Sequence, residues 1–202
     1  MKEVFYHFKR LTKEVESSTI KKTLNERRKS MNEQLYSIRN HQLGDMGWIT
    51  YRHAMTVAST YGWGEAFEAV VGEITSQFIK TYDPEKERCF VAEKDGQMIG
   101  CVFVVNAGNQ TAKLRLLFVE PKARGMGLAT RLVEEVVQFS RTAGYDSVQL
   151  WTMKQLDTAR HIYKKVGFRV THEEENQEFG ENLISETWSL KLTYNEETGK
   201  NH

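Results

Sequence analysis

The sequence LFVEPKARGMGLAT occupies residues 117–130 and joins an apolar run to the start of an amphipathic segment. Gly125 and Gly127 leave a turn without side chains between a predicted strand and a predicted helix, so backbone N–H groups can approach an anion there. The positive end of the helix dipole and the guanidinium of Arg124 favour phosphate at the same place. This stretch therefore predicts a pyrophosphate-binding turn.

Two other kinds of phosphate-binding turn do not match this stretch. A dinucleotide-binding fingerprint requires a third glycine where Thr130 stands, and a P-loop requires a lysine followed by serine or threonine. A glycine pair alone also allows close helix packing or a tight turn. The binding interpretation therefore depends on the elements around the turn.

Hydrophobic patterning around the turn alternates between strands and helices. A predicted strand at 111–119 is joined through the turn and a helix to a predicted strand at 147–152. Such a crossover connection makes these two strands parallel. The strands before it form an antiparallel meander. We therefore predict the fold class α/β (α+β), with a mixed, mostly antiparallel central sheet flanked by helices. Further strands are predicted at 35–39, 89–93, 98–106, 168–172 and 186–192, and helices from Asp45 through 57, over 67–79, over 125–143 and over 157–166. Asp45 is a favourable N-cap for the first of these helices.

The chain divides into three parts. Residues 1–34 have apolar residues at near-heptad spacing among many charges, which predicts an extra N-terminal helix; its basic stretch at 21–29 indicates a solvated face or a contact with nucleic acid or a partner. Residues 35–194 form the main domain, and 195–202 a frayed tail. We expect the helical extension to serve dimerisation or docking, so a homodimer is one predicted assembly.

Composition excludes several classes of protein. Hydrophobic residues make up 40% of the 202 residues and charged residues 27%, as in a globular protein, and the formal net charge of +1 gives no general attraction to nucleic acid or anionic membrane. Residues 1–11 lack a secretory apolar core, and no apolar stretch reaches the roughly 20 residues that cross a bilayer. We therefore expect a cytoplasmic protein without a membrane partner.

The two cysteines, Cys89 and Cys101, flank the predicted hairpin turn at Asp95-Gly96. A regular two-residue hairpin would place Cys101 opposite Phe90, so that the two thiols would face opposite sides of the sheet. We therefore expect two reduced thiols that act as small apolar residues.

Two motifs of the chain resemble those of the GNAT (Gcn5-related N-acetyltransferase) family and occur in the same order along the sequence. Residues 124–129 are similar to the family's Arg/Gln-x-x-Gly-x-Gly/Ala motif, and Ala159, Tyr163 and Gly167-Phe168 match the second signature, Ala-x-x-x-Tyr-x-x-x-Gly-Phe. The resemblance covers about residues 36–192 and implies the GNAT fold and N-acetyltransferase activity. It implies acetyl-CoA as cosubstrate and no metal.

A closer resemblance is to the acetyltransferase half of bacterial proteins in which a MarR-type winged-helix domain is fused to a GNAT domain. It is carried by residues 44–48, 61–63, 112–116, 150–152 and 159–163. The 34 residues before the domain are too few for a three-helix winged domain.

The family resemblance assigns roles to residues near the two motifs. Backbone groups of Leu117, Phe118 and Val119 would hold the pantetheine arm. Helical spacing alone favours an amphipathic core residue at Tyr163, but the motif match implies that Tyr163 protonates the departing sulfur. Many relatives have asparagine where this chain has Leu156, and Asp157 either compensates or caps the helix. The pyrophosphate would lie on Arg124, Gly125, Met126, Gly127, Leu128, Ala129 and Thr130.

The sequence signals for the acceptor site are less specific than those for the coenzyme site. The strand before the turn carries no acid, and alternation places Lys113 and Arg115 on one face. This face favours an acceptor with a carboxylate or phosphate if it lines the acceptor site; the alternative is a strand paired with surface acids. His53, Glu65 and Glu68, on the two early helices, are candidates for the general base or for acceptor binding, although a lone histidine on a helix is usually structural.

These observations predict an enzyme that transfers an acetyl group from acetyl-CoA to a primary amine of a small molecule. Two alternatives remain: an acyl-CoA-binding regulatory module that docks on DNA or a protein without turnover, and an acyltransferase that acts on a protein terminus. Retention of both Gly127 and Tyr163 favours an enzyme. Transfer to a macromolecule can be distinguished only by the acceptor site.

Overall fold

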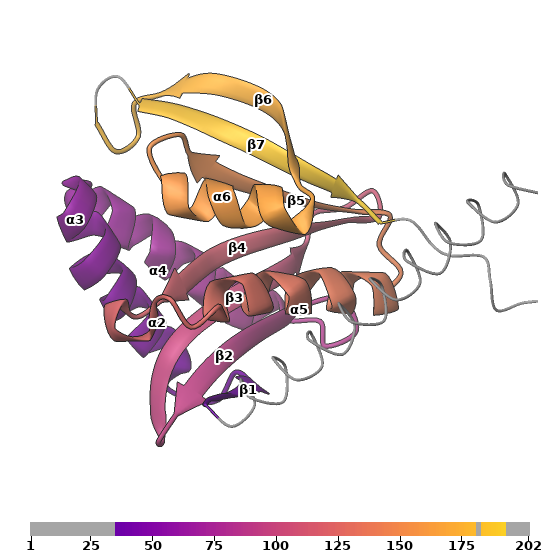
Figure 1. Cartoon of the computed structure of the whole chain (residues 1–202), viewed down its shortest axis with the longest axis horizontal. Coiled ribbons are helices and arrows are strands. Elements are labelled where there is room, and N and C mark those ends of the chain that lie inside the picture. Colours follow the sequence, from indigo (N-terminus) through magenta and orange to yellow (C-terminus); the bar gives the residue numbers. More distant parts are fainter. Residues whose placement is uncertain (1–34, 181–182, 193–202) are drawn as a thin grey trace, which may run out of the picture.

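The computed structural model describes residues 35–180 and 183–192 (Figure 1). The predicted N-terminal helix and the tail lie outside the described residues. The described elements follow the predicted order. The strands are β1 (Ser37–Asn40), β2 (Arg88–Lys94), β3 (Gln97–Asn106), β4 (Thr111–Val119), β5 (Ser147–Met153), β6 (Arg169–Asn176) and β7 (Leu183–Lys191). The helices are α2 (Asp45–His53), α3 (Ser59–Tyr61), α4 (Gly64–Thr81), α5 (Leu128–Thr142) and α6 (Asp157–Val166), with a π-helical turn at Ala54–Ala58 and a 3-10 turn at Pro121–Ala123.

One mixed sheet organises the described residues. Its strand order is β1-β2-β3-β4-β5-β7-β6, and β4 and β5 are the parallel pair among antiparallel neighbours. Helices α5 and α6 lie on one side of the sheet and α2 and α4 on the other (Figure 1). The predicted fold class is therefore confirmed.

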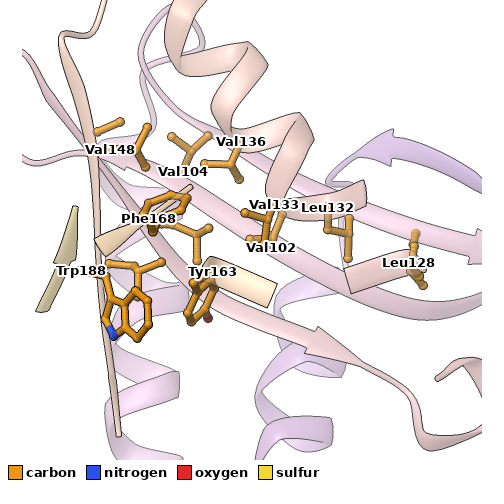
Figure 2. Packing of buried hydrophobic residues seen from close by; sticks show 14 of the residues in the cluster. Val102, Val104, Leu128, Leu132, Val133, Val136, Val148, Tyr163, Phe168 and Trp188 are labelled. Atoms are coloured by element: carbon orange, nitrogen blue, oxygen red, sulfur yellow. The ribbon is translucent and has the colours of Figure 1, made fainter. Parts of the chain in front are cut away.

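Each side of the sheet has its own core. Helix α5 packs on the sheet through Leu128, Leu132, Val133 and Val136, whose spacing of three or four residues produces one apolar face, and all four side chains are at most 1% exposed (Figure 2). On the other side, Ile49 and Phe78, from α2 and α4, pack against apolar residues of β2, β3 and β4.

Helix α2 begins at the predicted residue, but its N-cap is the residue before it. Asp45 was expected to be the N-cap; instead Gly44 holds that position with φ 96°, and Asp45 is the first helical residue. The Asp45 carboxylate accepts hydrogen bonds from the Gln42 backbone N–H at 2.7 Å and from the Arg39 guanidinium at 2.7 Å. Asp45 thus joins the strand to the helix start without capping the helix.

The register of the β2–β3 hairpin differs from the prediction. The Asp95-Gly96 turn is present, but a bulge at Ala92/Glu93 shifts the pairing, so Cys101 lies opposite Val91 and not opposite Phe90. Cys89 and Cys101 therefore share one face and one core cluster, and the prediction that their thiols face opposite sides is wrong. Both cysteines are buried and free, and burial raises the pKa of each thiol.

A second bulge lies in β4. Cys101 pairs with Phe118 but Phe103 pairs with Arg115, so β4 has one extra residue between these pairs. Leu116, within the extra segment, has φ 50°, a conformation unfavourable for leucine. Opposite the bulge, Gly100 lets β4 approach, because a Cβ there would lie 2.8 Å from the Phe118 carbonyl oxygen.

The Gly100→Ala substitution should destabilise the protein by about 1 to 3 kcal/mol, because the new methyl group must displace β4 backbone. Gly72, within α4, is the matched control: its added Cβ would meet Thr50 Cγ2 at 3.9 Å, so Gly72→Ala should stabilise the helix by up to about 1 kcal/mol. Urea unfolding of both variants measures the difference. Equal stability of the two variants would show that β4 tolerates the methyl group.

His53, at the end of α2, is a buried polar residue on the α2 and α4 side. Its side chain is 3% exposed, Nδ1 lies 2.8 Å from the Ile49 carbonyl oxygen, and Nε2 is buried without a hydrogen-bond partner in the described part of the chain. Burial lowers the pKa of His53 to about 4. The ring is therefore neutral at pH 7, and protonation opposes folding.

Acidification should therefore weaken folding. Because the folded-state pKa of His53 lies below its unfolded value of about 6.5, the unfolded chain binds more protons between about pH 4 and 6.5, and up to about 3 kcal/mol is lost as pH falls through this window. His53→Phe should remove this part of the pH dependence. Denaturant unfolding at several pH values tests it, and an unchanged slope in the variant would assign the acid sensitivity to other groups.

Candidate functional site

Strands β4 and β5 separate partway along the sheet. They pair from Thr111↔Ser147 to Leu114↔Leu150, and beyond this point β4 continues against β3 while β5 continues against β7. The edge of β4 that faces β5 after Leu114 therefore has no ladder partner among the described strands, and its backbone groups can bind an extended ligand. Leu117, Phe118 and Val119, the predicted pantetheine residues, lie in this segment.

The glycine turn follows β4 directly. Gly125 and Gly127 have φ values of 79° and 76°, and a Cβ at either position would meet no atom within 4 Å. The space beside the turn is therefore open, and glycine is needed for its backbone conformation. Arg124 is exposed at this turn.

Backbone donors converge at the turn. The first helical bond of α5 joins the Arg131 N–H to the Gly127 carbonyl oxygen at 3.1 Å. Among residues 35–180 and 183–192, no acceptor contacts the N–H groups of 125–130. The Leu128 side chain, 1% exposed, faces the core, and Met126 packs partly against the same cluster, so these residues can offer only their backbone to a ligand. The geometry suits an anion with several oxygens.

Tyr163, on α6, lies in the core between helix and sheet. Its side chain is 5% exposed, with ring centroids 6.1 Å from Phe168 and 6.2 Å from Trp188. The hydroxyl points away from the valine and leucine side chains of α5 (Figure 2) and has no hydrogen bond to any described residue. Burial raises the pKa of Tyr163, so the hydroxyl stays protonated at neutral pH.

A buried ion pair fixes the face of α6 that carries Tyr163. Glu186 on β7 is 0% exposed and accepts hydrogen bonds from Arg160 Nε at 2.9 Å, from Arg160 Nη2 at 3.0 Å and from Trp188 Nε1 at 2.8 Å. Arg160 is one turn from Tyr163, and Trp188 contacts the tyrosine ring. Asp157, expected to cap the helix as one alternative, is its exposed first residue and pairs with Arg160 at 3.3 Å; Leu156 occupies the N-cap.

A second buried ion pair holds α2 at the start of the turn. Glu120 follows β4 directly and is 7% exposed; its carboxylate receives Arg52 Nε at 2.5 Å and Nη2 at 2.8 Å. Sequence reasoning missed this pair and the Arg160–Glu186 pair. The partners are 68 and 26 residues apart, so no local pattern links them.

The predicted acceptor residues do not form one cluster. His53 is buried, with its ring centroid 5.1 Å from Phe118 and 6.5 Å from Phe67, whereas Glu65 and Glu68 are exposed on α4. His53 therefore lies beside the predicted thioester strand. Glu65 and Glu68 do not contact it.

Lys113 and Arg115 share one face of β4, as predicted. Both side chains are half-buried, and burial lowers the pKa of each. Within the described ranges no carboxylate forms an ion pair with either residue, although exposed Glu73 on α4 exerts an electrostatic effect on Arg115. The alternative of a strand paired with surface acids is therefore not supported by the described residues.

No described helix is both long and apolar enough to cross a membrane. No group of three or more histidine, cysteine or acidic side chains in the part of the chain that the structure describes is arranged to hold a metal ion.

The sequence is similar to that of known acetyltransferases. The model of the Acetyltransferase (GNAT) family matches residues 48–168. An uncharacterized N-acetyltransferase of Schizosaccharomyces pombe is 31% identical over 112 residues, or 55% of this chain and 69% of that protein. Human N-acetyltransferase 8 is 33% identical over 54% of this chain and 51% of its own length, and the spermidine N(1)-acetyltransferase of Escherichia coli K12 is 33% identical over 56% and 61%.

Solved structures share the fold. A ribosomal-protein-alanine N-acetyltransferase from Brucella melitensis matches 77% of this chain and 99% of its own with a TM-score of 0.65 at 20% identity. The Vibrio cholerae spermidine N-acetyltransferase, solved with CoA and spermine, matches 78% and 96% with a TM-score of 0.62 at 20% identity. Since the family model spans more than half of the chain, the protein belongs to the GNAT acetyltransferase family.

Proposed function

We propose that the protein transfers an acetyl group from acetyl-CoA to a primary amine of a small molecule. The observation that carries this proposal is the separation of β4 from β5 immediately before a turn with unpaired backbone N–H groups. An extended arm can pair with the free edge of β4 while its pyrophosphate binds residues 124–130. The E. coli and V. cholerae relatives named for spermidine acetylation support amine acceptors in general.

Different residues of the site bind the coenzyme, polarise the carbonyl and donate a proton. When bound, acetyl-CoA supplies the acyl thioester. Backbone groups of Leu117, Phe118 and Val119 hold the arm and polarise the carbonyl, and Arg124 adds a permanent charge at the pyrophosphate. As the amine forms its bond to the acyl carbon and the carbon–sulfur bond breaks, Tyr163 donates its proton to the sulfur.

The acceptor amine must lose a proton in the same reaction. Its carrier is not assigned: burial lowers the pKa of His53 to about 4, which makes His53 neutral but a weak proton acceptor, and Glu65 and Glu68 remain candidates for acceptor binding. Asp157 remains a candidate for the pantetheine arm. The closer resemblance to MarR–GNAT fusion proteins and a dimer formed through residues 1–34 also stay predictions.

Gly127→Glu should abolish coenzyme binding, because the new carboxylate would repel the pyrophosphate and the residue would hold a left-handed backbone. We expect acetyl-CoA affinity to fall by about 100-fold or more, measured by calorimetry. Gly62→Glu is the matched control, since Gly62 also has a positive φ, 72°, but ends α3. Unchanged binding in the Gly127 variant would overturn the assignment of the turn.

Tyr163→Phe separates a catalytic role from a core role. The hydroxyl has no partner among the described residues, so the variant should keep its stability while kcat for thiol release falls by about 100-fold. Tyr36→Phe is the control: Tyr36 is also buried with an unpartnered hydroxyl, but lies before β1. Equal kcat in the two variants would leave Tyr163 as a core residue.

A regulatory module without turnover would give a different pattern. It would bind acetyl-CoA through the same turn but release no thiol with any amine, amino acid or peptide. Release with peptides alone would instead favour transfer to a protein terminus.

A further inference from the structure

A polar strip of side chains lies on the face of β4, β5 and β7 opposite α5 and α6. Ladder partners on adjacent strands share a face, and Lys113↔Gln149, Gln149↔Ser189 and Trp151↔Thr187 are partners. None of these side chains is fully buried. We define the polar strip as Lys113, Arg115, Gln149, Trp151, Thr187 and Ser189.

The polar strip carries two cations and no acid. Lys113 and Arg115 are half-buried without an ion-pair partner in the described chain, and the acid that influences Arg115, Glu73, is exposed. Partial removal of a charge from water is unfavourable unless a counter-charge replaces the water. Three other partly buried arginines of the described fold have a carboxylate partner: Arg39 with Asp45, Arg52 with Glu120 and Arg160 with Glu186. Partly buried Arg88 instead donates hydrogen bonds to the Tyr82 hydroxyl and the Pro84 carbonyl oxygen. Among the described residues, the side chains of Lys113 and Arg115 have neither kind of partner.

The polar strip leads to the predicted acyl site. Arg115 precedes Phe118 by three residues, about 10 Å along a strand, and the Phe118 ring contacts His53 on the same side of the sheet. Trp151, on β5 two residues beyond Gln149, packs with Phe179, whose ring also stacks on Trp63 at 5.4 Å. A small acceptor whose amine reaches the thioester can thus place its far end near Arg115.

We infer that the acceptor is an amine that also carries an anionic group, a carboxylate or a phosphate, bound by Arg115 with Lys113 beside it. The inference rests on the proposed acetyl transfer and names its substrate class. Arginine provides a forked donor for such an anion, and lysine adds a point charge. A polyamine such as spermidine has only positive charges, so the same two residues disfavour it.

The experiment compares acceptors that differ only in the anion. The full chain is assayed for thiol release from acetyl-CoA with phenylalanine against phenethylamine, leucine against 3-methylbutylamine, O-phosphoethanolamine against ethanolamine, and spermidine. The anion-bearing member of a pair should have a KM about 10-fold lower or more. The amino-acid pairs and the phosphate pair show which anion the site takes.

Variants connect the preference to the polar strip. Arg115→Gln and Lys113→Gln should each raise KM for the anion-bearing acceptor by about 10-fold, with kcat and the KM of the member that lacks the anion within about twofold, because binding alone is lost. Lys80→Gln, on the exposed end of α4, is the matched control and should change neither. Wild-type pairs with equal KM, or preference for spermidine that both strip variants retain, would overturn the inference while leaving acetyl transfer intact.

Measurements of acceptor binding test this inference independently of the proposed acetyl transfer. If no acceptor releases thiol, calorimetric titration of the CoA-saturated protein with the same pairs decides. Tighter binding of the anion-bearing members, lost in Arg115→Gln, would support the anion site although the proposed transfer had failed. Equal or undetectable binding of both members would overturn the inference as well.

Discussion

The bulge in β4 decides where the rest of the site can be. Up to Leu114 the strand is bonded to β3 and β5, and after Leu116 it keeps only β3. A left-handed leucine costs about 1 to 2 kcal/mol, and the Cys101 thiol partly offsets this by approaching the Leu116 carbonyl oxygen to 3.4 Å. The strained residue lies where β4 loses its bonds to β5, immediately before the glycine turn.

Hydrophobic periodicity was sufficient to predict the elements but not their register. Helix α6 begins and ends at the predicted residues, because its apolar spacing and Gly167 are local signals. The two bulges were not predicted, since each depends on how a neighbouring strand packs. The error at Cys89 and Cys101 follows directly: one extra residue reverses the face on which every later side chain of the strand lies.

The candidate site shows the same limit. Residues 124–130 were predicted to bind pyrophosphate because glycine, a basic side chain and a helix start are adjacent in sequence. Burial of His53 and the free Nε2 atom could not be predicted, because they depend on α4 and β4 packing around α2. Neither could the unpaired state of Lys113 and Arg115: alternation places them on one face, but only the fold determines which acids come near.

Two arginine–carboxylate pairs attach helices to the sheet near the place where β4 and β5 separate. Arg52–Glu120 ties α2 to the end of β4, and Arg160–Glu186 ties α6 to β7 from the other side of the sheet. Buried pairs of this kind contribute little net stability, but breaking one leaves an uncompensated charge, so each pair favours one arrangement of its helix. Tyr163 and His53 are held on these helices, on opposite sides of the opening.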